Sequence, residues 1–594
     1  MAEAGRDDPA PTDEEHRPNG GALVADKLLE HGVRRVFSLI GGHISPILVE
    51  AKARGIRVVD VRDEKNAAFA ADATARLTGV PGVAVVTAGP GVTNTLTALQ
   101  NAALAQAPLV LLGGAAATML QGRGALQDID QMAVVRPHVK WACKVTRVAA
   151  LPAAIDRAFR VASSGVPGPV FVECPVDLLY GEELVRKWYR GASPQKPKNL
   201  QQAAMKWYLD RHVERVFAEA DGLSAFELPA LPDWRPLGPL AERAARLVEK
   251  AERPVLVVGS QATTRPEEVG EVAAAIADLG IPTYLAGMAR GLLGPNAEVH
   301  VRHQRRRALK DADLVLLAGV PADFRLDYGR AIAAKAKLLS ANLDVGILFK
   351  NRVPTLPVPG HPGRFLVRLA ETLGERSGRH QTWLDELRSR DGEREGAIDA
   401  MAKTPAPPVN PLALCRAIDR HMSDNALIVA DGGDFVATAA YTVRARGPLG
   451  WLDPGPFGTL GVGAGFALAA GLAHPGREVW LLYGDGAAGF SLVEMDTLVR
   501  HGVPVIAVIG NDAGWTQIER DQVEILHDDV GCRLAFTRYD QVAAGYGAEG
   551  FHLTRIEEAD RIFEAAKATA ARGKPVVINA EIGKTDFRKG SISM

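Results

Sequence analysis

Two acidic side chains stand at the ends of two apolar runs near the carboxyl end of this 594-residue chain. The segment VWLLYGDGAAGFSLVEMDTLVRHGVPVIAVIGNDAGW predicts a buried strand ending at Gly484-Asp485-Gly486, a helix, and a second strand ending at Asn511-Asp512. The 24 residues between Gly486 and Asn511 are enough for one β-α-β crossover, so both ends are expected at the same carboxyl edge of a sheet. Asp485 and Asp512 are hard oxygen ligands suited to Mg²⁺. The Gly-Ala-Ala turn can offer backbone N–H groups to a diphosphate. The alternative is a plain strand-end turn with capping acids.

A second candidate lies in VVDVRDEKNAAFAADATARLTGVPGVAVVTAGPGVTNTLTAL. Glu64 follows a predicted strand and opens a helix of small residues, which a neighbouring helix can approach closely. A Glu in the first turn of a helix more often compensates the helix dipole at the surface. The turn Gly89-Pro90-Gly91 comes next, and Thr93-Asn94 open the following helix.

Two further glycine-rich segments surround predicted strand ends. PGPFGTLGVGAGFALAAG contains Gly458 and Leu460, and ADGGDF contains Gly433 and Asp434 after an apolar run. By itself the first segment is equally compatible with close helix packing. The second ends a strand, as the Gly-Asp-Gly segment does.

Taken together, these motifs resemble the thiamine-diphosphate enzymes, the superfamily of acetolactate synthases and pyruvate decarboxylases. Asp512 stands where those relatives carry a second Asn. The resemblance implies that Asp485, Asp512 and the backbone carbonyl of Gly514 coordinate Mg²⁺. The cofactor contacts that it implies are at Glu64, Gly89, Asn94, Gly433, Asp434, Gly458, Leu460, Gly484, Gly486, Ala487, Ala488, Asn511 and Trp515.

The resemblance also assigns roles around the cofactor. Glu64 would hydrogen-bond N1′ of the pyrimidine, favouring the imino form that takes the proton from the thiazolium carbon. Leu460 would prop the cofactor into its bent shape, and the carbonyl of Gly458 would accept a hydrogen bond from the 4′-amino group. In relatives the cofactor lies between domains of two subunits, so the resemblance implies a homodimer or homotetramer with active sites at the subunit interface.

Finer segments favour one branch of this superfamily. FSLIGGHISPI, LLGGAA, GRGALQDIDQ, GNDAGWTQI and GKTDFRKGSISM resemble acetolactate-synthase-like proteins of the 2-hydroxyacyl-CoA lyase type. Such lyases cleave a 2-hydroxyacyl-CoA, for example 2-hydroxyisobutyryl-CoA, into formyl-CoA and a ketone or aldehyde, and the reverse is a condensation. Three alternatives stay open: a 2-oxo-acid carboligase or decarboxylase such as acetolactate synthase, oxalyl-CoA decarboxylase, and a catalytically silent assembly partner. Glu64, Asp485 and Asp512 argue against a catalytically silent protein, because an assembly partner does not need these acidic residues.

Three side chains are candidates for handling the substrate. His43 is predicted on a loop after a strand, at the expected ligand edge, although an isolated His there is as often structural. Gln127 matches a Gln that lines the active site in acetolactate synthases. Glu494 follows Gly486 on the next helix, where it would either face the cofactor or form a core ion pair.

The whole chain alternates short β-branched apolar runs with helical stretches, a pattern typical of buried parallel strands joined by crossover helices. We therefore predict three doubly wound α/β domains of the thiamine-diphosphate enzyme type, the outer two similar in design. The predicted divisions are a disordered tail (1–20), an N-terminal pyrimidine-binding domain (21–186), a linker (187–235), a central domain (236–375), a linker (376–404), a C-terminal diphosphate- and Mg²⁺-binding domain (405–583) and a tail (584–594).

The central domain of relatives holds FAD or ADP. In this chain it concentrates Arg305, Arg306 and Arg325, whose guanidinium groups suit phosphate. We expect an ADP or CoA nucleotide there, with FAD less favoured because no GxGxxG fingerprint is present; the alternative is a solvated basic helix face. Lys584 and Arg588 in the C-terminal tail would close over CoA as a lid, or belong to a frayed terminus.

Composition limits the remaining possibilities. Lys+Arg (69) nearly cancel Asp+Glu (70), so no basic field exists to attract nucleic acid or a membrane surface. The four cysteines lack CxxC spacing, which argues against a disulfide framework or a zinc site and fits a reducing compartment. The N-terminus shows no apolar signal sequence and no run of about 18 apolar residues occurs. We predict a cytoplasmic enzyme acting on a small acyl-CoA.

Overall fold

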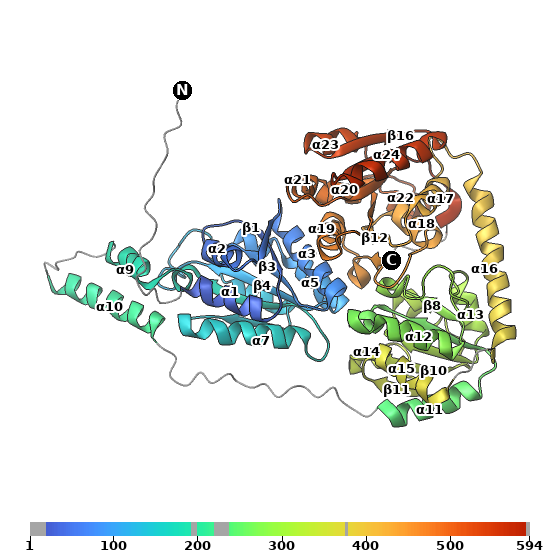
Figure 1. Cartoon of the computed structure of the whole chain (residues 1–594), viewed down its shortest axis with the longest axis horizontal. Coiled ribbons are helices and arrows are strands. Elements are labelled where there is room, and N and C mark those ends of the chain that lie inside the picture. Colours follow the sequence, from blue (N-terminus) through green and yellow to red (C-terminus); the bar gives the residue numbers. More distant parts are fainter. Residues whose placement is uncertain (1–18, 192–198, 219–236, 375–377, 590–594) are drawn as a thin grey trace.

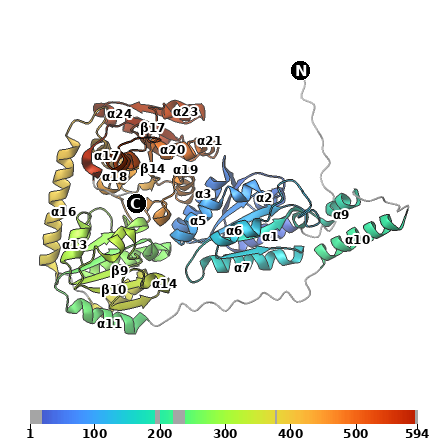
Figure 2. The ribbon, with the colours of Figure 1, turned by 180° about the vertical axis from the view of Figure 1, so that it is seen from behind.

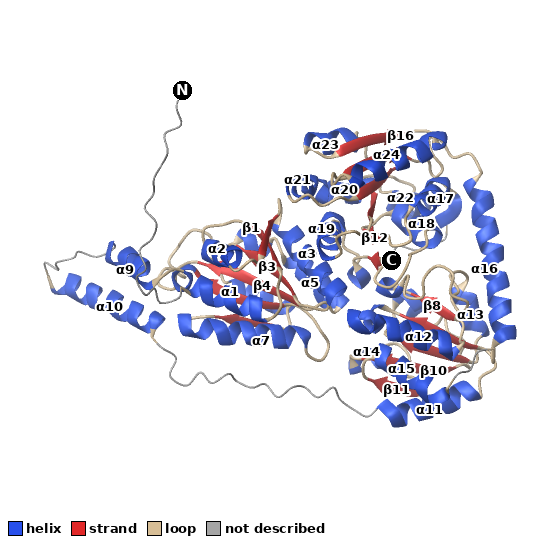
Figure 3. Ribbon diagram, viewed as in Figure 1, coloured by secondary structure: helices blue, strands red, loops and turns tan. Residues whose placement is uncertain are grey.

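The computed structural model describes residues 19–191, 199–218, 237–374 and 378–589 (Figure 1). Three parallel sheets of six, five and six strands lie in three successive segments of the chain. Helices cover both faces of each sheet (Figure 3). The predicted class, three doubly wound α/β domains, is confirmed. Within the described residues, no helix has the length and hydropathy needed to cross a membrane.

The N-terminal sheet has the order β2-β1-β3-β4-β6-β5 with all pairs parallel. Its central strands are uninterrupted apolar runs, as expected where helices bury both faces. The strands are β1 (Arg35–Leu39), β2 (Arg57–Asp60), β3 (Gly82–Val86), β4 (Leu109–Ala115), β5 (Trp141–Lys144) and β6 (Val170–Pro175). The helices of this segment are α1 (Gly20–Glu30), α2 (Ser45–Ala53), α3 (Glu64–Thr78), α4 (Pro90–Thr93), α5 (Leu96–Ala105), α6 (Gln131–Val135), α7 (Leu151–Ser163), α8 (Val176–Leu179), α9 (Glu182–Gly191) and α10 (Leu200–Phe217).

The central sheet has the order β11-β10-β9-β7-β8. Its strands are β7 (Pro254–Val258), β8 (Thr283–Leu285), β9 (Leu314–Ala318), β10 (Lys337–Asn342) and β11 (Leu356–Pro359). Its helices are α11 (Leu237–Glu249), α12 (Val269–Leu279), α13 (Arg305–Asp311), α14 (Val345–Leu348) and α15 (Pro362–Leu373). The order reverses between β7 and β9, which makes the carboxyl end of that pair the switch point of the sheet.

The C-terminal sheet repeats the topology of the first. Its order is β13-β12-β14-β15-β17-β16, which matches the N-terminal order when each set is counted from its own first strand. The strands are β12 (Leu427–Ala430), β13 (Trp451–Leu452), β14 (Val479–Gly484), β15 (Ile506–Asn511), β16 (Glu549–Leu553) and β17 (Val576–Glu581). The helices are α17 (Pro411–His421), α18 (Asp434–Thr442), α19 (Gly463–Ala473), α20 (Asp485–Ser491), α21 (Met495–Arg500), α22 (Thr516–Leu526), α23 (Tyr539–Gly545) and α24 (Ala559–Ala571).

Helix α3 of the N-terminal domain packs against α19 of the C-terminal domain (Figure 1). The two helices occupy equivalent places, because each precedes the third strand of its sheet. Both are rich in Ala and Gly, which lets the backbones approach: a Cβ at Gly465 would lie 2.9 Å from the carbonyl oxygen of Asn66. Phe69 meets Phe466 edge to face, with ring centroids 6.1 Å apart. The small-residue helix that the sequence indicated is therefore a domain contact.

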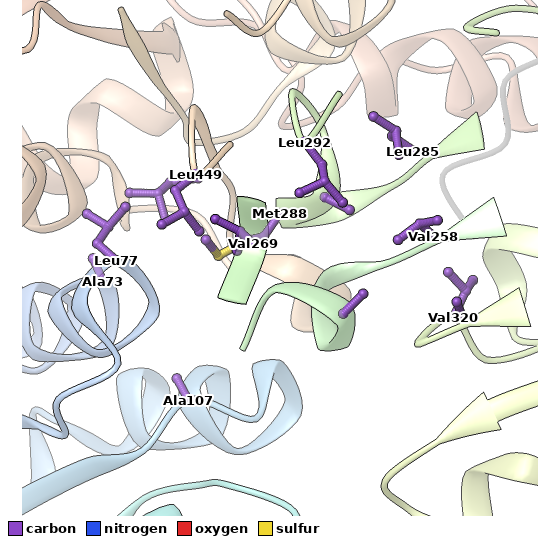
Figure 4. Close-up of a cluster of buried hydrophobic side chains, with 14 of the residues drawn as sticks. Ala73, Leu77, Ala107, Val258, Val269, Leu285, Met288, Leu292, Val320 and Leu449 are labelled. Carbon is purple, nitrogen blue, oxygen red and sulfur yellow. The ribbon is translucent and has the colours of Figure 1, made fainter. Parts of the chain in front are cut away.

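The three domains share one continuous apolar cluster. Ala73 and Leu77 of α3, Met288 and Leu292 of the central domain, and Leu449 of the C-terminal domain all belong to it (Figure 4). Because side chains from all three domains pack in one core, the domains form a single body around the α3–α19 contact.

Two predicted linkers contain helices. Residues 376–404 hold α16 (Gln381–Ala402), which runs along the outside of the central and C-terminal domains (Figures 1 and 2). Its charged residues are not a flexible connection: Glu395 meets Arg302, His303 and Arg416 across the two domains. Residues 187–235 contain the end of α9 and all of α10. The predicted N-terminal tail lies outside the described residues up to residue 18, and α1 already begins at Gly20.

We predict that the α3–α19 contact fails when Gly465 gains a side chain. Gly465→Ala adds a Cβ 2.9 Å from two α3 atoms, the Asn66 oxygen and the Phe69 Cβ, and should lower the free energy of unfolding by about 1–3 kcal/mol. The control is Gly396→Ala in α16, where an added Cβ has no neighbour within 4 Å. It should raise stability by roughly 0.5–1 kcal/mol, since Ala is the better helix former. Urea unfolding midpoints that move in the same direction for both variants would contradict this packing argument.

Candidate active site

Three loops meet at the carboxyl edge of the C-terminal sheet. They follow β12, β14 and β15, which are adjacent and parallel in that order. The N–H of Gly484 donates to the carbonyl of Gly432 at 3.0 Å, which joins the first loop to the second. The predicted meeting of Gly484-Asp485-Gly486 with Asn511-Asp512 at one edge is confirmed.

Two carboxylates dominate this edge. Asp485 accepts the N–H of Gly486 at 2.9 Å and the N–H of Gly514 at 3.0 Å. Burial raises the pKa of Asp485, and burial together with the neighbouring Asp485 charge raises the pKa of Asp512 to about 7. A buried acid beside a partly buried acid of like charge is an arrangement that a cation neutralises. Ala513 between Asp512 and Gly514 has a φ of 54°, so the chain reverses there in a conformation that L-residues rarely adopt.

The described residues contain no cluster of three or more His, Cys, Asp or Glu side chains able to hold a metal ion. A cation at Asp485 and Asp512 would need further oxygen ligands, because Mg²⁺ takes six. A backbone carbonyl and the oxygens of a bound diphosphate are chemically suited to complete such a site. The donor set therefore fits a metal that is held jointly by the protein and a phosphate ligand.

The surface at the start of α20 is bare backbone. A Cβ at Gly486 would lie 2.4 Å from the ring of Trp515, so only Gly fits beneath that indole. Gly433, the residue before α18, has a φ of 107°, which also requires Gly. Asp434 forms an ion pair with Arg520 at 2.9 Å. The backbone N–H groups of Ala487 and Ala488 lie in the first turn of α20, and together with these glycines they suit close approach by a diphosphate.

Asp431, which the sequence analysis did not select, holds the loop of Gly458 and Leu460 in place. Its buried carboxylate accepts the N–H groups of Gly461 at 2.9 Å and Gly463 at 2.8 Å. Burial raises the pKa of Asp431 to about 7. Leu460 projects over the β12 loop, since a Cβ at Gly432 would meet its Cδ2 at 2.2 Å. The sequence did carry a signal for a functional role of Asp431, because this residue directly follows the apolar strand β12.

In the N-terminal domain, the structure brings Glu64 and Asn94 together. The Nδ2 of Asn94 donates to Oε2 of Glu64 at 3.0 Å, and the Glu64 side chain is buried. Asp63 caps α3 by accepting the N–H of Lys65 at 3.0 Å. Glu64 is thus fixed as the first residue of a capped helix and is not a solvated dipole-compensating residue.

His43 and Gln127 lie beside the turn that leads from β3 to α4. The Nδ1 of His43 is 3.1 Å from Oγ1 of Thr87, and burial lowers the pKa of His43, which favours the neutral imidazole near pH 7. Gln127 has a φ of 62°, and its carbonyl oxygen would lie 2.6 Å from a Cβ at Gly89. Gln131 was missed: its Oε1 accepts the N–H of Gly89 at 2.8 Å, which ties the turn to the loop of Gln127.

Three domain models of one enzyme family match the chain. The thiamine pyrophosphate enzyme N-terminal TPP binding domain matches residues 18–134, the central domain matches 241–369 and the C-terminal TPP binding domain matches 431–580. The order is that of the three sheets.

The chain belongs to the thiamine pyrophosphate enzyme family.

Relatives of this thiamine pyrophosphate enzyme match it over nearly its full length. The 2-hydroxyacyl-CoA lyase 2 of Danio rerio is 48% identical over 594 residues, covering 98% of this chain and 94% of that protein. The 2-hydroxyacyl-CoA lyase 2 of Homo sapiens is 46% identical, covering 97% and 92%. A probable acetolactate synthase of Mycobacterium bovis is 34% identical, covering 96% of each chain.

Glu494 of this thiamine pyrophosphate enzyme is fully buried where the outer domains meet. Its carboxylate accepts hydrogen bonds from the N–H of Arg62, from Asn66 and from Thr497. Within the described part of the chain these partners are all neutral donors, so the core ion pair, one of the two alternatives that the sequence left open, does not form there. A direct role in proton transfer is also disfavoured, because the carboxylate is already occupied by these donors.

The arginines of the central domain gather around a cavity of about 420 Å³ between the central and C-terminal domains. Its lining includes Arg305, Arg306 and Arg325. Arg588 lies beside the same cavity, because its guanidinium carbon is 5.2 Å from the ring centroid of Tyr441, which also lines the cavity. Lys584 instead pairs with Glu519 on α22.

Arg305 is the least neutralised of these side chains. Its guanidinium donates to the carbonyl of Arg325 at 3.0 Å, and among the described residues no carboxylate lies within ion-pair distance of it. Burial and the nearby Arg290 charge lower the pKa of Arg305. Arg325, by contrast, pairs with Asp323 at 2.7 Å. The cavity therefore presents uncompensated positive charge that suits a phosphate.

The crevice at the switch point of the central sheet is smaller than the arginine cavity. The crevice lined by Ser260, Gly319 and Asn342 holds about 160 Å³, below the roughly 300–1,000 Å³ of typical ligand pockets. Gln261 bridges it, hydrogen-bonded to Gln106 at 2.6 Å and to Asn342 at 3.1 Å.

We predict that Gly486→Ala weakens cofactor binding by at least about tenfold, or ~1.4 kcal/mol. The new methyl group would collide with the Trp515 ring at 2.4 Å and displace it into the space above α20. Gly489→Ala is the matched control, because it adds the same group to the same helix with no neighbour within 4 Å. Calorimetric titration of thiamine diphosphate at saturating Mg²⁺ measures both. Equal dissociation constants for the two variants would contradict the proposal that the start of α20 binds the diphosphate.

Proposed function

We propose that this chain is a thiamine-diphosphate-dependent carbon–carbon lyase that cleaves a 2-hydroxyacyl-CoA into formyl-CoA and a ketone or aldehyde. The observation that carries the proposal is the near full-length similarity to proteins named 2-hydroxyacyl-CoA lyase 2, at 46–48% identity. The lower identity of 34% to a probable acetolactate synthase makes 2-oxo-acid carboligation the second candidate. In the reverse direction the same reaction joins formyl-CoA to a carbonyl compound.

The residues at the C-terminal sheet edge would hold the cofactor. Asp485, Asp512 and the carbonyl of Gly514 would bind Mg²⁺, and the glycine-lined start of α20 would face the diphosphate. When bound, thiamine diphosphate supplies a carbon nucleophile and an electron sink for cleavage. Leu460, held by the loop that Asp431 fixes, is the bulky side chain placed to support its shape.

Glu64 is the residue proposed to activate the cofactor. A buried carboxylate at the start of a capped helix can hold a hydrogen bond to the pyrimidine ring at a constant position. Asn94 donates to one of its oxygens at 3.0 Å, which leaves the other oxygen for the ligand. The contact between Glu64 and Asn94 supports their proposed roles, and Gly89 is proposed to contact the cofactor from the start of α4.

His43 and Gln127 are proposed to act on the substrate. A neutral imidazole can accept the proton of the 2-hydroxyl group, and the lowered pKa of His43 keeps it neutral near pH 7. Thr87 orients the ring through Nδ1, which leaves Nε2 for the substrate. Gln127 can donate a hydrogen bond to the thioester oxygen from the same side of the turn.

The arginine cavity is proposed to bind the nucleotide of CoA. Phosphates attract guanidinium groups strongly, and no carboxylate of the described ranges pairs with Arg305 in competition with them. Arg306 and Arg325 lie on its wall, and Arg588 brings the C-terminal tail to Tyr441 at its rim. A tail that the Arg588–Tyr441 contact holds at the edge of this cavity can cover the bound acyl-CoA. Lys584 lies at the α22 end of the same tail.

We also propose a homodimer or homotetramer in the cytoplasm, with sites between subunits. Helix α22 follows the metal loop directly, yet none of its residues is buried in the single chain. Ile525 and Leu526 on it are 62% and 69% exposed. Apolar side chains of this size beside a site favour a subunit contact.

The activity is tested with purified protein, thiamine diphosphate, Mg²⁺ and either 2-hydroxyisobutyryl-CoA or mandelyl-CoA. Formyl-CoA is the expected product, and Glu64→Gln should lower its rate by roughly 10²-fold or more, because it removes the acid that polarises the pyrimidine. Pyruvate and oxalyl-CoA are the comparison substrates. Acetolactate without formyl-CoA would reject the lyase, and full activity of the Glu64→Gln variant would reject the activation role.

The CoA site is tested by Arg305→Ala. Loss of a charged hydrogen bond to phosphate is worth about 1.5–3 kcal/mol, so KM for the acyl-CoA should rise about 10- to 100-fold with little change in kcat. Arg307→Ala removes the same charge from the same first turn of α13, at an exposed position that does not line the cavity, and should leave KM near the wild-type value. Similar KM values for the two variants would place the nucleotide elsewhere.

A further inference from the structure

A buried carboxylate joins the two outer domains at the position where Glu64 enters its helix. Glu494 is the last residue of the short helical turn Leu492–Glu494, which follows α20. Its relative exposure is 0%. Burying an ionisable group without a counter-charge is costly unless hydrogen bonds compensate for the lost water, so the contacts of this side chain identify what it holds.

All of those contacts are with donors. The backbone N–H of Arg62 lies 3.0 and 3.1 Å from the two carboxylate oxygens, and the Nδ2 of Asn66 donates to one of them at 2.9 Å. The hydroxyl of Thr497 donates to the other. An ionised carboxylate has only acceptors, so it fits this set. Burial raises the pKa of Glu494, and these donors oppose that shift.

The residues that Glu494 contacts bracket Glu64. Arg62 is two positions before it and Asn66 is two positions after it, so the helix start is held from both sides. Neighbouring contacts support the same docking: Asp60, at the end of β2, meets Arg500 at 2.5 Å and His501 at 3.0 Å. Glu494 is the buried member of this group, whereas Asp60 and Arg500 are partly exposed.

We propose that Glu494 is a positioning residue that fixes the start of α3, and so the carboxylate of Glu64, relative to the C-terminal domain. The inference rests on the proposed role of Glu64 toward the cofactor. Glu494 touches no reacting atom; it determines where Glu64 stands. A displacement of about 1 Å at a catalytic group can cost roughly 10²-fold in rate, so loss of this anchor has a catalytic consequence larger than its effect on cofactor affinity.

The distal end of α3 shows that this role is specific to the helix start. Arg76 there pairs with Asp72 at 2.7 Å and donates to the carbonyl of Asp453 at 2.9 Å. That contact also joins the outer domains, but it lies three turns from Glu64. Glu494 alone among the described side chains of the C-terminal domain hydrogen-bonds both Arg62 N–H and Asn66.

The test compares Glu494→Met, Glu494→Gln and the control Asp496→Asn. Met has a similar length and no carboxylate, so Arg62 N–H and Asn66 lose their acceptor. Gln keeps one oxygen for Asn66 and Arg62 and is the conservative variant. Asp496 is two residues on and carries the same charge. It pairs with the side chains of Arg500 at 2.7 Å and Arg62 at 3.7 Å, but it accepts no backbone N–H of residues 62–66, so it tests the loss of charge and of the Arg62 side-chain contact without the loss of the backbone acceptor.

The first measurement uses the protein without cofactor. Amide hydrogen exchange at Arg62 should accelerate at least about tenfold in Glu494→Met, less in Glu494→Gln, and not in Asp496→Asn, because the N–H loses its buried acceptor. Unchanged protection in Glu494→Met overturns the proposed anchor. If that variant does not fold, the same comparison between Glu494→Gln and wild type decides.

The second measurement follows exchange of the C2 proton of thiamine diphosphate bound with Mg²⁺. We expect a loss of about 10²-fold in Glu494→Met, a partial loss in Glu494→Gln, and wild-type exchange in Asp496→Asn, with dissociation constants for thiamine diphosphate within about threefold of each other. Exchange equal to the control, or a loss of cofactor affinity as large as the loss of exchange, overturns the proposal. This readout needs no acyl-CoA, so failure of the lyase assignment would leave it standing.

Discussion

The contact between α3 and α19 is the constraint on which the rest of the structure depends. These helices can meet only because Gly465 leaves room for the carbonyl of Asn66. One end of α3 carries Glu64 and the other carries the Arg76–Asp72 pair, so a shift of the helix contact would move both. Close packing of small residues resists such shifts, because a well-packed interface has few alternative arrangements. The position of Glu64 is therefore set largely by a face of the C-terminal domain.

The shared topology of the outer sheets gives this contact its symmetry. Each domain contributes the helix before its third strand, and each presents its functional loops at the carboxyl edge of its sheet. The two domains have nevertheless diverged in chemistry. One edge carries two neighbouring acids and bare glycine backbone that suit a cation and a diphosphate, and the other carries Glu64, His43 and Gln127 with neutral hydrogen-bonding groups. Parallel strands make this possible, since their loops vary while the sheet beneath remains packed.

Most of the fold was predictable from the sequence, and the site was predictable in part. Uninterrupted apolar runs such as those of β4 and β14 bury both faces, and this pattern is local. The pairing of Asp485 with Asp512 followed from one crossover length. The roles of Asp431 and Gln131 were missed, because each acts through backbone N–H groups of a loop distant in sequence. The charged segment that forms α16 was predicted to be a linker, since its stabilising partners lie in two other domains.

Glu494 illustrates the difference between what the sequence determines and what the tertiary structure decides. The sequence alone determined three parallel α/β domains, the acidic pair at a strand edge and a Glu at the start of a small-residue helix, because periodicity, crossover length and helix composition are properties of neighbouring residues. Only the tertiary structure decided that Glu494 meets Arg62 and Asn66, which are more than 400 positions away in the chain. It likewise decided that the central arginines enclose a cavity with Tyr441 and that α3 lies on α19. These are contacts between surfaces, and their complementarity exists only once the domains have packed.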